Sequence, residues 1–157
     1  MRQRWSKTVA RLSLVGWMGA AIFFVAVAIK PIRSPELDTP SKALLASLLF
    51  PGYYAFGFTL LSVGWVATLL AAPRRWSWQL FWVTLAILIT LTDWIWIYGP
   101  LAEMTRRQWV EQAAPSADFR TYHLASMAIN SVGLLCGSIA AVLACLPERT
   151  DTTNVAS

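Results

Sequence analysis

The chain has 157 residues, of which 57% are hydrophobic and only 13% are charged. Soluble domains carry about 25% charged residues, so this composition excludes an ordinary soluble globule. The net charge of +5 does not indicate nucleic-acid binding, because the basic residues flank apolar stretches and form no stripe. The composition is that of a single-domain integral membrane protein surrounded by the lipid bilayer.

Four apolar stretches follow one another along the chain. They cover residues 12–29, 44–70, 80–98 and 122–146, and each can supply most of the roughly 20 residues that a membrane helix needs. None shows the two-residue alternation of a membrane β-barrel. We therefore predict an all-α fold: a four-helix transmembrane bundle with antiparallel, up-and-down topology. Residues 148–157 are expected to form a polar tail.

The first stretch also has features of a signal peptide, since a basic segment precedes it and it contains Ala-Val-Ala at residues 26–28. Its apolar run exceeds the roughly 7–15 residues of a signal core, which favours a retained span. Lys and Arg are slightly more numerous on the N-terminal side of the spans, which favours cytoplasmic termini. We expect the plasma membrane, in a bacterium the inner membrane, as the location.

The second stretch contains Pro51 near its start. Because proline removes a backbone donor and clashes with the preceding turn, we expect a kink there, or a short interfacial piece before the span proper. Tyr53, Gly57 and Gly64 fall on one face of the helix. The small residues predict close packing against another helix.

The third stretch contains a carboxylate, Asp93, within ILITLTDWIWIYGP (residues 87–100). Asp93 precedes Tyr98 by five residues, which places it about 8 Å inside that end of the span. An ionisable residue inside a membrane is costly and usually faces the bundle or a water-filled cavity. The tryptophans around it are interpreted as interfacial anchors.

The fourth stretch carries polar and small residues on one face. A helical sector of about 80° contains His123, Ser126, Asn130, Gly133 and Gly137. Gly133 and Gly137 have the small-xxx-small spacing that brings helices close together. We expect this face to look into the bundle and to meet the Tyr53–Gly57–Gly64 face of the second span.

The polar residues of three spans lie at one depth, in the outer third of the bilayer, and we expect nothing comparable in the inner half. The functional hypothesis is that Asp93 pairs with His123, and that Tyr53 and Asn130 complete a small polar site with Ser126 at its edge. The alternative is structural. In that case Asp93 reaches the interface among its tryptophans, and His123 and Asn130 only bond across helices.

Other chemistries lack their motifs. The sequence contains no Gly-rich phosphate loop, no GxSxG elbow and no His/Cys cluster with metal spacing. One histidine does not make a zinc site, so we expect no metal and no catalytic residue. We expect no cofactor and favour a non-enzymatic protein, with a haem- or quinone-holding subunit that uses His123 as the alternative.

Three patches resemble the small four-span family catalogued as domain of unknown function 4149, the transmembrane-protein-205-like group. They are GWMGAAIFFVAVAIKPI (16–32), ALLASLLFPGYYAFGF (43–58) and FRTYHLASMAIN (119–130), the last with Phe119, His123, Ser126 and Asn130 in the family's order. Asp93 has no counterpart in the family pattern. The resemblance implies an integral membrane protein without an established activity, and a link of one eukaryotic member to drug resistance hints at transport or trafficking.

Three functions follow as hypotheses. The first is a membrane protein that binds or moves a small polar ligand, ion or lipid headgroup at the outer-leaflet site. The second is the redox subunit with His123. The third is a structural or assembly protein whose polar residues only hold the bundle together. Membrane-protein partners or a homo-oligomer are compatible with each.

Overall fold

The computed structural model describes residues 2–71, 76–111, 114 and 116–146, so the expected tail at 148–157 lies outside the described residues. The described residues contain no strand. The helical segments, of which η1 and η2 are π-helical, are α1 (Arg2–Phe23), η1 (Phe24–Ala28), α2 (Ile29–Arg33), α3 (Thr39–Ala71), α4 (Trp76–Thr92), η2 (Asp93–Tyr98), α5 (Gly99–Val110) and α6 (Phe119–Cys145).

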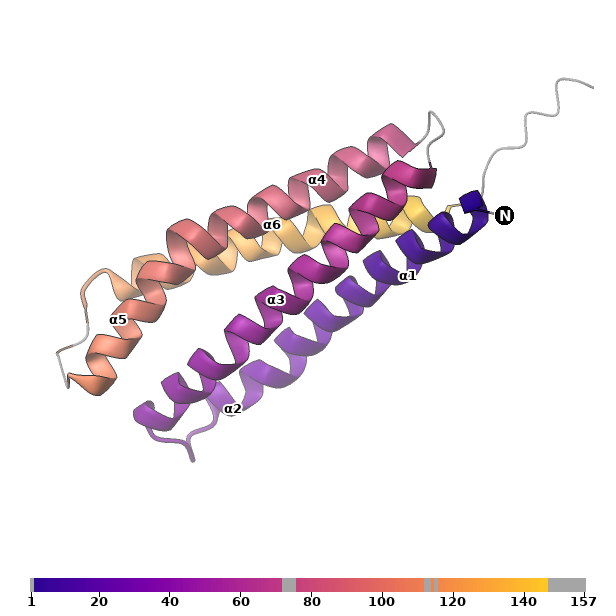
Figure 1. Ribbon diagram of the computed structural model, residues 1–157. Helices are drawn as coiled ribbons and strands as arrows, with labels where there is room; N and C mark the ends of the chain where they lie inside the picture. Colours follow the sequence, from indigo (N-terminus) through magenta and orange to yellow (C-terminus); the bar gives the residue numbers. More distant parts are fainter. Residues whose placement is uncertain (1, 72–75, 112–113, 115, 147–157) are drawn as a thin grey trace, which may run out of the picture.

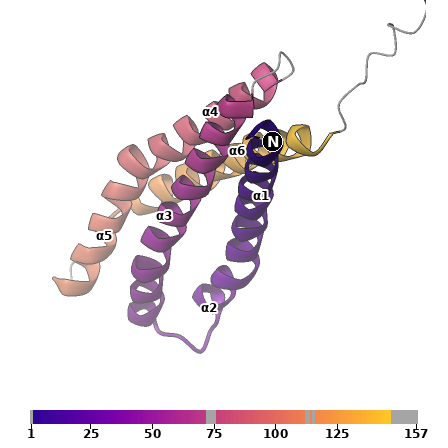
Figure 2. The same ribbon diagram turned by 45° about the vertical axis from the view of Figure 1, so that its right-hand side comes forward.

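The helices form an antiparallel four-helix bundle, as predicted. Helix α1 packs on α3 and α6, and α4 packs on α3 and α6, so that α3 and α6 lie diagonally opposite each other. All four helices come together where α1 begins (Figure 1), which we call the N-terminal end. At the other end, called the distal end, α2 and the start of α3 diverge from α5, and a rotated view shows the same separation (Figure 2).

Four helical segments are long and apolar enough to cross a membrane: Gln3–Val27, Leu44–Ala71, Trp78–Gln108 and Phe119–Cys145. Large apolar side chains cover the outside of the bundle. Trp96 is 72% exposed and Leu48 is 68% exposed, for example, and a water-soluble monomer rarely exposes such a surface over its whole length. The protein is therefore an integral membrane protein whose lipid-facing side chains surround a small core.

The core is built around Trp17 of α1. Its indole ring is 4% exposed and lies against two glycines, Gly57 of α3 and Gly137 of α6. A Cβ atom at Gly137 would overlap the six-membered ring, so this position has room only for glycine. The glycine faces of the second and fourth spans therefore do not meet directly, contrary to our expectation, because Trp17 lies between them.

The two other glycines of these faces also lie at helix contacts. Gly64 lies against Leu14 of α1, and Gly133 lies against Ile89 of α4. Small residues continue along the buried face of α6 towards the N-terminal end: Cys136, Gly137, Ala140, Ala141 and Ala144. In a bilayer, where apolar burial drives association weakly, such residues allow the backbones to approach and to gain dispersion contacts.

Helix α3 runs without a break from Thr39 to Ala71 with Pro51 inside it. The separate interfacial piece considered for residues 41–50 therefore does not form, and this segment is the first part of the same helix. Proline removes a single backbone hydrogen bond, and membrane helices tolerate this loss.

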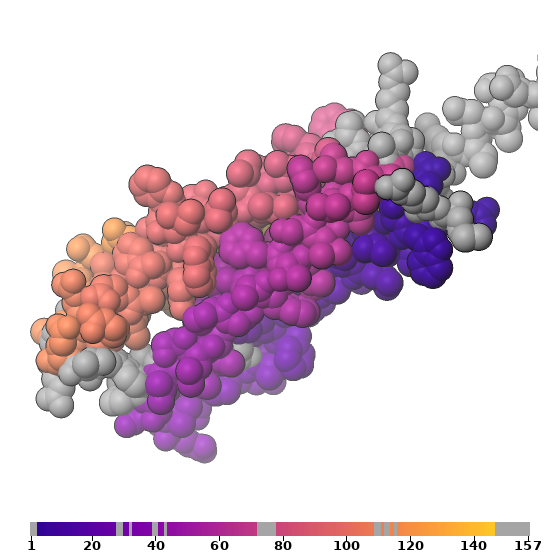
Figure 3. Space-filling model, viewed as in Figure 1, coloured from indigo at the N-terminus to yellow at the C-terminus, as the bar shows by residue number. Residues whose placement is uncertain are grey.

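Neutral polar contacts hold α3 to α4 in the N-terminal half. The Trp65 indole N–H donates to Thr84 Oγ1 at 2.9 Å, and the Gln79 amide donates to Thr68 Oγ1 at 3.1 Å. Both threonine hydroxyls in turn donate to carbonyls of their own helices. In the space-filling view the side chains of α3 and α4 meet along the middle of the bundle (Figure 3). The sequence interpretation did not anticipate this second polar region.

Polar side chains of α1 close two helix ends. Gln3 Nε2 donates to the carbonyl of Ala71 at 3.1 Å, and Arg11 Nε donates to the carbonyl of Ala144 at 2.7 Å. These carbonyls belong to the last turns of α3 and α6, which lack partners within their own helices. Helix α1 thus supplies both core packing and caps for the ends of α3 and α6.

Candidate functional site

Asp93 is the first residue of η2, and its side chain is completely buried. The backbone N–H of Gly99 bonds to the carbonyl of Trp94, five residues back, instead of four as in an α-helix. The wider turn directs Asp93 and Trp94 into the bundle. Single π-helical turns inside longer helices occur frequently at functional sites.

Two side chains from other helices donate to the same oxygen of Asp93. The Tyr54 hydroxyl of α3 and the Asn130 amide of α6 both donate to Oδ2, the latter at 2.6 Å. The Asn130 amide also donates to the Ser126 carbonyl at 3.0 Å, which orients its side chain. Asp93 therefore links three of the four membrane helices through one carboxylate oxygen.

The second carboxylate oxygen, Oδ1, is buried and has no hydrogen-bond partner in the structure. Nearly all buried polar atoms in proteins are paired, and an unpaired one costs about 1–3 kcal/mol. Among the described residues, no Lys, Arg or His forms an ion pair with Asp93. This oxygen is the place in the bundle where a bound species would gain most.

A small cavity adjoins the network and has room for about one water molecule. Both partners of Asp93, Tyr54 and Asn130, line it, together with Trp17, Tyr53, Gly57, Thr90, Gly133 and Leu134. The Trp17 indole N–H donates to no acceptor within the described residues. The lining therefore combines an indole without a hydrogen-bond partner among the described residues with the Tyr54–Asn130 pair.

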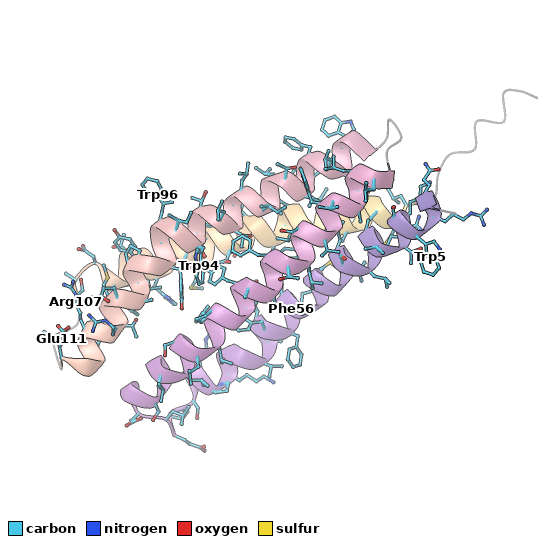
Figure 4. All side chains as sticks on the ribbon, in the orientation of Figure 1. Trp5, Phe56, Trp94, Trp96, Arg107 and Glu111 are labelled. Atoms are coloured by element: carbon cyan, nitrogen blue, oxygen red, sulfur yellow. The ribbon has the colours of Figure 1, made fainter. Side chains whose placement is uncertain are left out.

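An aromatic cluster covers the network on its distal side. Its rings are in mutual contact: Phe24, Phe50, Tyr53, Tyr54, Trp94 and Tyr98. Trp94 stacks on Tyr98 with centroids 4.8 Å apart, and Phe24 stacks on Tyr53 at 4.3 Å. Figure 4 shows Trp94 directed towards the interior and Trp96 directed away from it. Trp96 therefore lies where an anchor would, whereas Trp94 belongs to the site.

The structure does not bring His123 to Asp93, so the expected pair is wrong. His123 is exposed on α6, and its ring stacks on that of Phe119 with centroids 6.1 Å apart. It precedes Asn130 by seven residues, or about 10 Å along the helix, and so it lies well beyond the carboxylate. Asp93 does not reach the interface either, because its side chain is completely buried.

Tyr53 is half-buried in the aromatic cluster, and its hydroxyl makes no hydrogen bond within the described residues. Its neighbour Tyr54 contacts the acid instead. A signal for this existed in the sequence, because Tyr54 precedes Gly57 by three residues and Leu61 by seven, on the buried face of α3. Trp17 was missed too, although Ala10, Leu14, Trp17 and Ala21 have the spacing of one helix face.

No family model, curated protein or solved structure matches the chain. The resemblance to the domain of unknown function 4149 family stays a prediction, and the site has to be interpreted from its own geometry.

Proposed function

We propose that the protein binds or moves a small ion or polar ligand at Asp93. The observation that carries the proposal is the buried, unpaired Oδ1 atom of an acid whose two hydrogen-bond partners, Tyr54 and Asn130, line a water-sized cavity. An acid buried only to hold helices together would gain from pairing both oxygens. This one has two donors on Oδ2 and none on Oδ1, which leaves an acceptor free for a ligand.

The proposed location follows from the same reasoning. The distal end, which contains the site, is proposed to face outwards, with both termini in the cytoplasm of a bacterial cell. The slight excess of Lys and Arg on the N-terminal side supports this orientation. The proposed relationship to the domain of unknown function 4149 family agrees with a membrane protein of this size and adds no activity.

A structural role is the second candidate, and the bonds at Oδ2 favour it. Tyr54 and Asn130 tie η2 to α3 and α6, so Asp93 acts as a three-way link at the end where the helices diverge. Under this alternative the bonds at Oδ2 stabilise the bundle, and added cations do not stabilise it further through Asp93.

A cofactor-holding role for His123 has less support. The imidazole is exposed and stacked on Phe119, outside the polar network. The described residues also contain no group of three His, Cys, Asp or Glu side chains able to hold a metal ion. A cofactor bound by His123 would have to lie on the outer surface of α6.

Thermal unfolding of the purified protein in detergent separates the two candidates. A species that binds only the folded state raises the melting temperature in a concentration-dependent way. Wild type and Asp93→Asn are compared across a pH series and across chlorides of lithium, sodium, potassium and magnesium. We expect the wild type to respond to at least one series and the variant to lose that response. A constant difference between the two proteins under all conditions would exclude ligand binding and leave the structural role.

A further inference from the structure

We propose that the species bound at Asp93 is a proton, and that it exchanges through Tyr54 and a single water molecule in the adjoining cavity. This inference rests on the proposed function and specifies its ligand. Size is the first argument. The cavity has room for about one water molecule, so a lipid headgroup or a hydrated metal ion does not fit beside the network.

The ligand set is the second argument. A bare metal cation requires several oxygen ligands around it, typically six or more for the common hard divalent ions. Here Asp93 Oδ2 already accepts from Tyr54 and Asn130, and the cavity is also lined by Trp17, whose indole has a donor and no acceptor. Donors repel a metal cation, whereas a proton on the carboxylate needs no ligand beyond the oxygen that it neutralises.

Charge is the third argument. An ionised carboxylate is costly to bury without a counter-charge, and a proton removes that cost. The ionisable groups that face Asp93 are tyrosines: Tyr53 and Tyr54 on α3 and Tyr98 at the end of η2. Helix α6 presents Asn130 at this depth, with exposed His123 two turns away, and α1 presents Trp17. On α5, Glu103 pairs with Arg106 and Arg107 in exposed ion pairs.

The route follows from the hydrogen bonds. Tyr54 donates to Asp93 Oδ2 and lines the cavity, so its oxygen can accept from a water molecule there. A proton that arrives on the water passes to the Tyr54 oxygen as the hydroxyl proton of Tyr54 passes to Asp93. The water molecule and a neutral tyrosine are regenerated, and the carboxylate becomes a carboxylic acid. The Trp17 indole holds the water by donating to it.

Two glycines of α3 provide a matched test of the cavity. A Cβ at Gly57 would lie 3.4 Å from Trp17 Nε1, which is an ordinary contact, so Gly57→Ala fills the cavity without a clash. Gly52 lies on the same helix with no atom within 4 Å of an added Cβ, so Gly52→Ala serves as the control. Tyr54→Phe removes the relay hydroxyl.

Infrared difference spectroscopy of the protein in liposomes tests the inference. We expect a carboxylic-acid C=O band that grows on acidification, is the same in sodium, potassium and tetramethylammonium chloride, and is absent in Asp93→Asn. If that variant does not fold, a shift of the band in Asp93→Glu gives the assignment. After transfer to D2O, the band shifts as deuterium replaces the acid proton. The rate of this exchange should be about tenfold lower in Gly57→Ala and in Tyr54→Phe than in wild type, which corresponds to a barrier higher by about 1.4 kcal/mol. Gly52→Ala should match wild type.

The other outcomes identify which claim fails. A carboxylate band of Asp93 that changes with one metal cation and never converts to the acid would overturn the proton and keep ligand binding. An acid band that exchanges at wild-type rate in Gly57→Ala and Tyr54→Phe would overturn the route through the cavity. An Asp93 band that responds to neither pH nor any salt would reject the proposed function itself.

Discussion

The two ends of the bundle solve the problem of polar atoms inside a membrane in different ways. At the N-terminal end, neutral side chains pair with one another, Trp65 with Thr84 and Gln79 with Thr68, and the charged Arg11 side chain donates to a backbone carbonyl at the end of α6. At the distal end, an acid is buried with one oxygen paired and one not. At the first end, small residues of α6 allow the helices to pack closely. At the second end, the aromatic cluster covers the polar network.

This difference distinguishes polar groups that only hold the helices together from polar groups that are able to bind a ligand. Completed neutral hydrogen bonds between membrane helices contribute about 0.6 kcal/mol each on average and do not depend on pH. An incomplete network around an ionisable group leaves interaction capacity unused, and the proposed ligand would act there. Trp17 lies between the two regions, because its ring fills the space against Gly137 and its side chain also lines the cavity.

The largest effect is expected at this dividing residue. Gly137→Ala would force the new methyl group into the Trp17 ring, and overpacking of this kind costs about 1–3 kcal/mol or more. Gly19→Ala on α1 is the control, since nothing lies within 4 Å of its added Cβ. Melting temperatures in detergent measure the effect. Equal stability of the two variants would mean that Trp17 does not fill this space.

The next effect belongs to the distal end. Tyr54→Phe removes a donor to a carboxylate, and hydrogen bonds to charged groups contribute about 1.5–3 kcal/mol. Tyr53→Phe, one residue away, removes a hydroxyl that makes no hydrogen bond within the described residues and should change stability little. Unfolding in a denaturing detergent ranks the two variants. A larger loss in Tyr53→Phe would place the wrong tyrosine at the acid.

A smaller effect is expected at the N-terminal end. Thr84→Val removes the acceptor of the Trp65 N–H and should cost about 0.6 kcal/mol, at most about 1.7. The cost should be the same at every pH, in contrast to changes around Asp93. Thr59→Val, which removes only a bond to the carbonyl of Ala55 on the same helix, is the control. A pH-dependent cost of Thr84→Val would contradict the division between the two ends.

The smallest effect is expected outside the membrane. The exposed carboxylate of Asp38 lies at the start of α3, where hydrogen bonds from the Ser41 side chain and from the Ser41 backbone N–H lower the pKa of Asp38. A lowered pKa in the folded state means that Asp38 stabilises the protein above its unfolded-state pKa and loses this contribution as the pH falls through the folded-state pKa. The melting temperature of Asp38→Ala should lie slightly below wild type at neutral pH and converge with it in acid. A difference that persists in acid would show that the charge is irrelevant.

The fold could be predicted from the sequence because it depends on long stretches without charged residues. Such stretches can be recognised without knowing which helices contact one another. The depth of Asp93 could also be estimated, since the rise per residue of a helix is fixed. The tyrosine that contacts Asp93 could not be predicted, because Tyr53 and Tyr54 are adjacent and the choice between them depends on the rotation of the helix about its axis. His123 shares a helix face with Asn130 but lies two turns further along, so its position on that face was correct and its depth was not.

The π-helical turn at Asp93 also determines the direction of everything that follows it. A turn with one extra residue shifts the helical phase by about 100°, so α5 presents a face that an unbroken α-helix would turn elsewhere. Deleting one residue from η2, for example Ile95, should restore α-helical spacing and rotate α5 about its axis. The same deletion would move Trp94 and Tyr98 relative to Tyr54. The number of residues in η2 therefore determines both the surroundings of the buried acid and the face that α5 presents at the distal end.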